Sequence, residues 1–201
     1  MNTVFGVVGS GNFHVTNALV AGGARFVAAR HEGGAAVMAD AWARTTGSAG
    51  VVTVHQGPGL TNAMTGIAEA AKSRTPLLVL AAEAPEIRSN FHVDVAGLAA
   101  AVGAVAMRLY SPASAVADAH RAYATALGRR TVILALPLNV QGSDCEPGPV
   151  PALRRAYPPG PAARVHRGPR RPRPGGRTRA AGGRVRGPAG HLRGGQGPVP
   201  R

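Results

Sequence analysis

Residues 51–71 read VVTVHQGPGLTNAMTGIAEAA and combine three local signals. The apolar, β-branched run at 51–55 is typical of a strand that is buried on both faces. A Gly-Pro-Gly turn follows at 57–59. Apolar residues then recur at the spacing of one helix face: Leu60, Met64, Ile67, Ala68 and Ala71. The stretch therefore predicts a strand, a sharp turn and a helix in direct succession.

The same alternation of strand-like and helical patterns extends along the chain to about residue 141. Strand-like runs occur at 4–8, 25–29, 51–55, 77–82, 107–110 and 131–136. A second helical face precedes the central stretch: Ala35, Ala39, Trp42 and Ala43. Alternating β and α segments predict an α/β fold with a doubly wound, mostly parallel six-stranded sheet and right-handed crossovers.

Ligands of such sheets bind at the carboxyl ends of the strands. Three segments with polar or glycine residues fall there: residues 9–12 after the first run, Glu32 after the second and residues 55–59 after the third. We therefore expect the functional site at this edge.

Two sequence blocks, one after the second strand-like run and one after the third, form a combination that is specific to one group of proteins. Residues 31–44 read HEGGAAVMADAWAR, and residues 55–62 read HQGPGLTN. Together they resemble the pyrimidine-binding (Pyr) domain of thiamine-diphosphate enzymes of the acetolactate synthase-like superfamily. The resemblance runs from about residue 4 to residue 141. In that family the glutamate of the first block activates the cofactor.

The resemblance implies that Glu32 is the catalytic group and that Glu32, Gly57, Pro58 and Asn62 bind the cofactor. Simpler interpretations exist for two of them. A carboxylate at a helix N-terminus is stabilised there by the helix dipole. The Asn62 amide could cap a helix instead of reaching a ligand.

Three further residues are candidate substrate contacts: His55, Gln56 and His14. His55 and Gln56 directly precede the turn, at a position that shapes substrate choice in the family. The alternative for His55 is a partly buried histidine bonded to the backbone. No metal ligand is predicted.

A dinucleotide-binding motif is the rival explanation for this edge. Gly9-Ser10-Gly11 follows a strand, and Glu32 lies 21 residues after Gly11. However, His14 occupies the place of the third glycine, where a side chain would prevent close packing of helix and strand. We therefore favour the thiamine pattern over NAD or FAD binding.

The composition changes abruptly after residue 145. Residues 1–145 hold 10 Lys and Arg and 8 Asp and Glu, whereas residues 146–201 hold 13 Arg and a single Glu. Of the 56 residues from 146 onward, 44 are Arg, Pro, Gly or Ala. Such a segment has too few large apolar side chains to offset its ordering entropy. We expect residues 142–201 to form a disordered tail.

Arg, Pro, Gly and Ala are encoded by codons made mainly of G and C. A shifted reading frame in a GC-rich gene would produce this amino-acid composition, and we expect the tail to be translated out of frame. A nucleic-acid-binding tail is the less favoured alternative, because such tails usually repeat RGG units or interleave aromatic residues. Residues 1–141 would then be a Pyr domain that lacks the family's first helix.

The expected function is that of a thiamine-diphosphate-binding fragment of a 2-oxo-acid carboligase or decarboxylase, inactive alone. In the family, Mg²⁺ and the diphosphate are held by a domain whose motif does not occur here, and FAD, where used, is bound mainly by a middle domain. The expected partner is the diphosphate-binding domain of a neighbouring subunit in a homo- or heterodimer. The alternative is the Pyr subunit of a split enzyme.

No secretory signal or membrane span is evident in the sequence, and Cys145 is the only cysteine. We therefore expect a cytoplasmic protein.

Overall fold

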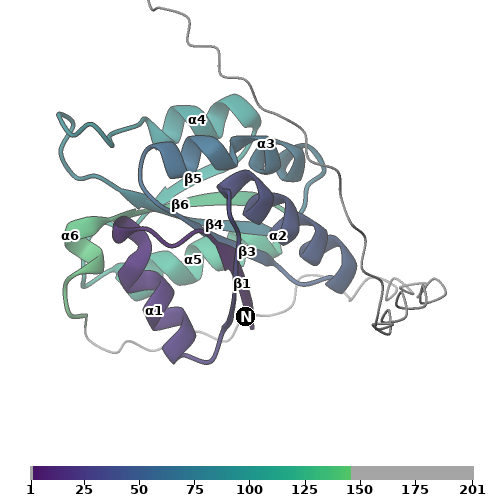
Figure 1. Cartoon of the computed structure of the whole chain (residues 1–201), viewed down its shortest axis with the longest axis horizontal. Helices are drawn as coiled ribbons and strands as arrows, with labels where there is room; N and C mark the ends of the chain where they lie inside the picture. Colours follow the sequence, from purple (N-terminus) through teal and green to yellow (C-terminus); the bar gives the residue numbers. More distant parts are fainter. Residues whose placement is uncertain (1, 146–201) are drawn as a thin grey trace, which may run out of the picture. The chain divides into compact units, whose positions relative to one another are not determined.

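The structure is a computed structural model that describes residues 2–145. The chain forms one sheet of six parallel strands in the order β2-β1-β3-β4-β6-β5 (Figure 1). The strands are β1 (Thr3–Gly6), β2 (Arg25–Ala28), β3 (Gly50–Val54), β4 (Leu77–Glu83), β5 (Val105–Arg108) and β6 (Thr131–Pro137). The helices are the 3-10 turn η1 (Ser10–Asn12), α1 (Phe13–Ala21), α2 (Glu32–Thr46), α3 (Pro58–Lys72), α4 (Val95–Val102), α5 (Ala115–Leu127) and α6 (Leu138–Gln141). The predicted parallel α/β fold is confirmed.

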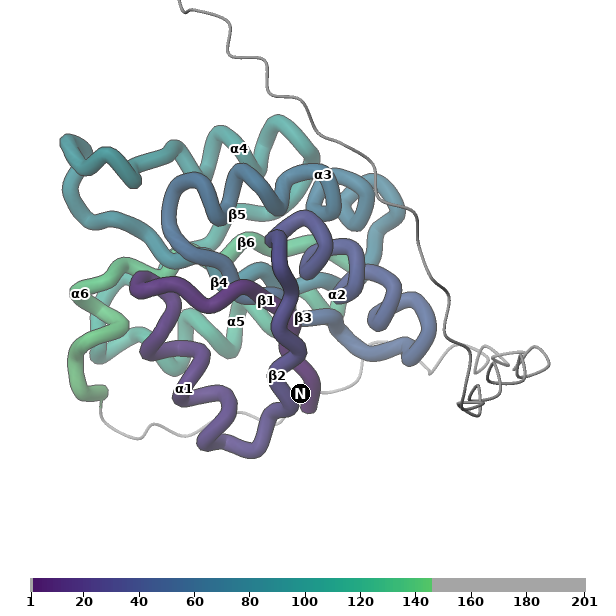
Figure 2. Tube along the Cα trace, in the orientation of Figure 1, coloured from purple at the N-terminus to yellow at the C-terminus, as the bar shows by residue number. Residues whose placement is uncertain are grey.

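The helices divide between the two faces of the sheet as right-handed crossovers require. The connections from β2 to β3, from β3 to β4 and from β4 to β5 cross the sheet in one direction. The connections from β1 to β2 and from β5 to β6 cross it in the opposite direction. Accordingly, α2, α3 and α4 pack on one face, and α1, α5 and α6 contribute to the core on the other. Figure 2 shows α3 and α4 above the strands and α1 and α5 below them.

The direction of winding reverses between β1 and β3, which are neighbours in the sheet. In open α/β sheets, the loops that leave two such strands diverge to opposite faces and leave a crevice at their carboxyl ends. The segments that follow β1 and β3 are residues 7–12 and 55–59, so the fold brings the glycine-rich segments predicted from the sequence to one place.

Small residues let α2 and α3 approach closely. A Cβ added at Gly66 would lie 2.6 Å from the Cβ of Ala36. The buried face of α3 therefore differs from the predicted one: Leu60 and Ile67 are buried as expected, but they are joined by Ala63, Gly66 and Ala70. Met64, Ala68 and Ala71 are only partly buried. Apolar spacing could not place this face correctly because alanines occur on both sides of α3, and the close contact with α2 decides which of them are buried.

Two predicted strands end two residues earlier in the structure, whereas the ends of the other four differ by at most one residue. The fifth strand was expected at 107–110 but runs from Val105 to Arg108. Leu109 still donates its N–H to the carbonyl of Ala135 in β6, and the N–H of the next residue, Tyr110, donates to the carboxylate of Asp118 at 3.1 Å. The first strand stops at Gly6, and Val8 is half exposed in the loop that follows.

The expectations for a disordered, out-of-frame tail concern residues that lie almost entirely outside the described part of the chain. Within residues 2–145, no helix is long and apolar enough to cross a membrane.

Candidate functional site

Glu32 is the first residue of α2, directly after the loop that leaves β2. His31 caps this helix: its backbone is extended, and its Nδ1 accepts a hydrogen bond from the N–H of Gly33 at 3.0 Å. A carboxylate in the first turn is favoured by the positive end of the helix dipole. The local sequence thus places the Glu32 carboxylate at the carboxyl edge of the sheet.

The Glu32 carboxylate is oriented by a side chain from the neighbouring helix. The Nδ2 of Asn62 donates a hydrogen bond to Oε2 of Glu32 at 3.1 Å. Asn62 is the fifth residue of α3, whose N-cap is Gly57, so Asn62 does not cap the helix. The bond joins the two sequence blocks that carry the family resemblance, although 30 residues separate them.

The turn at 57–59 is shaped by its glycines. Gly57 has a φ of +61°, and a Cβ at this position would lie 2.8 Å from the carbonyl oxygen of Phe91. Pro58 begins α3, where its missing N–H costs nothing. A Cβ at Gly59 would lie 3.6 Å from Oε1 of Glu32 and 3.0 Å from Cβ of His55. Gly59 therefore keeps the space beside Oε1 clear of side-chain atoms.

His55 follows β3 and connects two loops at this edge. Its Nδ1 accepts a hydrogen bond from the N–H of Gly11 at 3.0 Å. Its ring also meets the ring of Phe91 edge-on, with centroids 5.4 Å apart. Because Nδ1 acts as an acceptor, the neutral imidazole carries its proton on Nε2. Within residues 2–145, Nε2 has no hydrogen-bond partner.

Gln56 lies beneath the loop after β1. The residue is 7% exposed, and its Oε1 lacks a hydrogen-bond partner in the described part of the chain. Any side chain at Gly11 would collide with this oxygen. Buried polar atoms are normally paired. An unpartnered amide oxygen so close to the crevice is a group that a ligand or a water molecule could satisfy.

Sequence reasoning missed two residues that hold this loop. Asn12 is fully buried: its Nδ2 donates to the carbonyl of Val7 and to Oγ1 of Thr53, while its Oδ1 accepts from the N–H of Gly9. Gln141 donates from Nε2 to the carbonyl of Gly11 at 3.1 Å. The Asn12 amide stands in a glycine-rich loop, which is a recognisable signal. The contact of Gln141 spans 130 residues and has no local signature.

His14 does not take part in the hydrogen-bond network around Glu32 and His55. It lies in the first turn of α1, is exposed and meets the ring of Phe13 with centroids 6.3 Å apart. No hydrogen bond or ion pair in the described part of the chain links it to Glu32, His55 or Asn62.

No three His, Cys, Asp or Glu side chains in the described residues are grouped so as to hold a metal ion.

The first half of the chain is similar to proteins of a known family. Residues 1–100 match the family described as thiamine pyrophosphate enzyme, N-terminal TPP binding domain. The acetolactate synthase isozyme 2 large subunit of Escherichia coli is 41% identical over 105 residues, which are 50% of this chain and 19% of that protein. The isozyme 3 large subunit is 48% identical over 81 residues, which are 40% of this chain and 14% of that protein.

A probable 2-ketoarginine decarboxylase of Pseudomonas aeruginosa is 44% identical over 80 residues, covering 40% of this chain and 14% of its own length. The chain thus spans less than a fifth of each of these relatives. The matched region contains β1 to β4 and the first six residues of α4, including Glu32, Asn62 and the turn at 57–59. This chain belongs, through residues 1–100, to the family of N-terminal TPP-binding domains of thiamine pyrophosphate enzymes.

Proposed function

We propose that residues 1–141 bind the aminopyrimidine ring of thiamine diphosphate and that Glu32 is the group that activates it. The observation that carries this proposal is the hydrogen bond from Asn62 to Oε2 of Glu32, beside Gly59, which adds no side-chain atom next to Oε1. One carboxylate oxygen is held by the protein, and the other is directed to a ligand.

The residues at the site fit this half of the cofactor. A flat ring needs close approach to the backbone, and Gly59 allows it beside Oε1 of Glu32 because it carries no side chain. The ring nitrogen N1′ needs a carboxyl group that shares a proton with it, and Glu32 supplies one.

Thiamine diphosphate, when bound, supplies an electron sink for bonds adjacent to a carbonyl group. The role of Glu32 is to hold a proton at N1′, and that of Asn62 is to fix the plane of the Glu32 carboxyl. A positioned acid–base group of this kind typically contributes roughly 10²–10⁴-fold in rate.

The substrate class in this proposal is a 2-oxo acid, processed by carboligation or decarboxylation. The names of the relatives support it, since they include acetolactate synthases and a 2-ketoarginine decarboxylase. His55 would present its Nε2–H to an oxygen of the substrate, because Nδ1 is already occupied by the N–H of Gly11.

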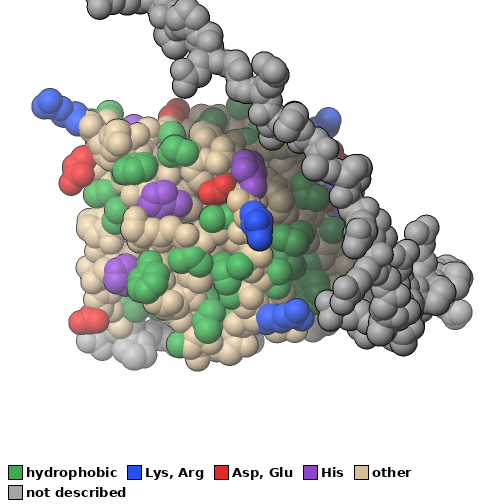
Figure 3. Space-filling view, in the orientation of Figure 1, with side chains coloured by type: hydrophobic (Ala, Val, Ile, Leu, Met, Phe, Trp, Pro, Cys, Tyr) green, Lys and Arg blue, Asp and Glu red, His purple; other side chains and the backbone are tan. Residues whose placement is uncertain are grey.

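The diphosphate and Mg²⁺ would be held by a diphosphate-binding domain of a neighbouring subunit, either in a homodimer or as the partner of a split enzyme. Apolar surface at the carboxyl edge supports such a partner. Large hydrophobic side chains are exposed in segments that follow strands: Val8, Phe13, Ile87, Phe91 and Tyr110. Figure 3 shows hydrophobic side chains and histidines spread over one face, with few charged groups between them. Alone, the chain would be inactive.

The test is a titration of the 201-residue chain with the aminopyrimidine fragment of the cofactor, 4-amino-5-hydroxymethyl-2-methylpyrimidine, followed by ¹⁵N NMR. We expect a dissociation constant on the order of 1 mM, typical of so small a ligand. The amide signals of Gly57, Gly59 and Gly33 should shift.

The Glu32→Gln variant should lose these shifts while keeping the dispersed spectrum of the folded chain. Glu86→Gln is the matched control, because Glu86 is exposed in the loop after β4. The proposal is wrong if the fragment shifts signals elsewhere, or if Glu32→Gln and Glu86→Gln bind it as the parent does.

A further inference from the structure

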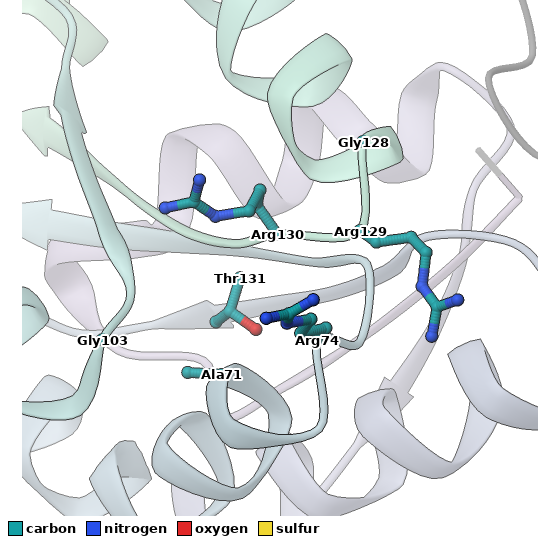
Figure 4. A pocket seen from close by; sticks show the side chains of 7 residues that line it. All are labelled: Ala71, Arg74, Gly103, Gly128, Arg129, Arg130 and Thr131. Carbon is teal, nitrogen blue, oxygen red and sulfur yellow. The ribbon is translucent and has the colours of Figure 1, made fainter.

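A second depression lies at the opposite edge of the sheet, where the strands begin. It has a volume of about 590 Å³. Seven residues line it: Ala71, Arg74, Gly103, Gly128, Arg129, Arg130 and Thr131. They come from the C-terminal ends of α3, α4 and α5 and from the first residue of β6. Figure 4 shows Arg74 reaching beneath Thr131, with Arg129 and Arg130 extending to either side.

The lining is strongly cationic. None of the seven residues is acidic. Arg74 and Arg130 are exposed, and neither forms an ion pair in the part of the chain that the structure describes. Their positive charges therefore face the depression without a carboxylate partner from its lining.

The helix ends do not neutralise this charge. A helix C-terminus carries a partial charge of roughly −0.5, and basic residues placed there are favoured for that reason alone. Three such ends offset at most about 1.5 charges. Arg74 and Arg130 alone exceed that amount, and Arg129 adds a third guanidinium to the lining.

Two of these arginines occupy unfavourable backbone conformations. Arg74 has a φ of 53° and Arg129 a φ of 62°, and they are the only non-glycine residues with positive φ in residues 2–145. Each stands just after a helix C-cap, where glycine is the usual residue because it has no Cβ. Arginine at these places costs stability, so stability alone does not account for it.

We propose that this depression binds a polyphosphate anion, recognised through a diphosphate group held between Arg74 and Arg130. The planar guanidinium group matches phosphate oxygens in pairs. The volume lies within the range of small-molecule sites. Both side chains are long and exposed, so they can rotate onto a common anion. The site is independent of the one at Glu32, which lies at the other end of the strands.

The test uses isothermal titration of the 201-residue chain with inorganic pyrophosphate in 0.15 M NaCl, where weak exposed charge interactions are screened. The double variant Arg74→Gln/Arg130→Gln removes the two guanidinium groups. Arg25→Gln/Arg88→Gln is the matched control: it removes the same charge from two exposed arginines outside the depression and keeps residues 146–201 unchanged. Circular dichroism verifies the fold of both.

We expect the first variant to bind pyrophosphate at least about tenfold more weakly than the parent, as the loss of charge-assisted hydrogen bonds predicts. The control should bind within about twofold of the parent. In ¹⁵N NMR, pyrophosphate should shift the amides of Gly103 and Gly128 in the parent and the control. If ATP binds with the same affinity as pyrophosphate, the site recognises the diphosphate group alone. If ATP binds more tightly than pyrophosphate, the site recognises a nucleotide.

The proposal is overturned if both double variants lose affinity equally, because the binding then reflects net charge. It is also overturned if pyrophosphate leaves the amide signals of Gly103 and Gly128 unshifted. This holds even if an acidic protein is found to bind at the depression. Neither result would affect the assignment of Glu32.

Discussion

Replacing Gly66 by alanine is expected to destabilise the domain by separating α2 from α3. The added Cβ would lie 2.6 Å from Cβ of Ala36, 3.0 Å from the backbone nitrogen of Val37 and 3.1 Å from the carbonyl carbon of Ala36. Carbon atoms pack best at about 3.5–4.0 Å, so the helices must move apart by about 1 Å. Two of the three contacts involve backbone, which cannot rotate out of the way.

The expected cost follows from two opposing effects. Overpacking of this kind costs roughly 1–3 kcal/mol. Alanine regains up to about 1 kcal/mol of helix propensity over glycine. Taking the upper end of the steric cost because backbone is involved, the net loss is about 2 kcal/mol. With a urea m-value of about 2 kcal/mol/M for a domain of this size, the unfolding midpoint should fall by about 1 M.

The same displacement should disturb the site. The bond from Asn62 to Glu32 joins α3 to α2 at 3.1 Å, and an extra 1 Å would take it beyond hydrogen-bond range. The side-chain amide signals of Asn62 should therefore shift in the Gly66→Ala spectrum. Urea unfolding followed by circular dichroism gives the stability change in the same samples.

Gly34→Ala is the matched control for this prediction. Gly34 also lies in a helix, α2, but a Cβ there would have no atom within 4 Å. The substitution should leave stability unchanged or raise it by up to about 1 kcal/mol. If Gly66→Ala unfolds at the same urea concentration as Gly34→Ala, or a higher one, the close packing of α2 on α3 is not the constraint described above.

Three other predictions concern single side chains. Arg74→Gly should raise the melting temperature through a gain of about 1 kcal/mol, since glycine adopts its φ of 53° without strain; a lower melting temperature would contradict this. His55→Phe keeps an aromatic ring but loses the backbone N–H bond to Nδ1, which should cost about 1 kcal/mol in urea unfolding, whereas an unchanged midpoint would count against that bond. The Ser73 hydroxyl and then Arg44 lower the pKa of the Glu69 carboxyl from 4.5, so its contribution should be present above pH 4.5 and lost as the pH falls through the folded value. Carboxyl NMR titration checks this: Glu69 should titrate below 4.5 in the parent and return toward that value in Arg44→Ala.

Much of the fold follows from patterns that are local in the sequence. Continuous apolar runs predicted all six strands because parallel strands are covered on both faces. The segments after the first three strands were expected at one edge of the sheet, since all parallel strands end on the same side. The position of Glu32 directly after the second apolar run likewise placed it at this edge.

Details that depend on neighbours were beyond these patterns. The buried face of α3 turned toward Ala63 and Ala70 because the partner helix comes close enough to exclude larger side chains. Just beyond the fifth strand, where the apolar run had predicted further strand, the N–H of Tyr110 donates to a carboxylate from α5. Neither effect has a counterpart in the periodicity of the segment concerned.

The amino-acid sequence by itself determined the type and order of the elements, the family resemblance and the edge of the sheet that carries Glu32. Only the tertiary structure decided which groups come together: the amide of Asn62 with Glu32, the N–H of Gly11 with His55, and Arg74 and Arg130 in the lining of one depression. The physical reason is that periodicity and capping act over a few residues. Contacts between distant residues depend instead on strand order, crossover handedness and the distance at which two helices pack.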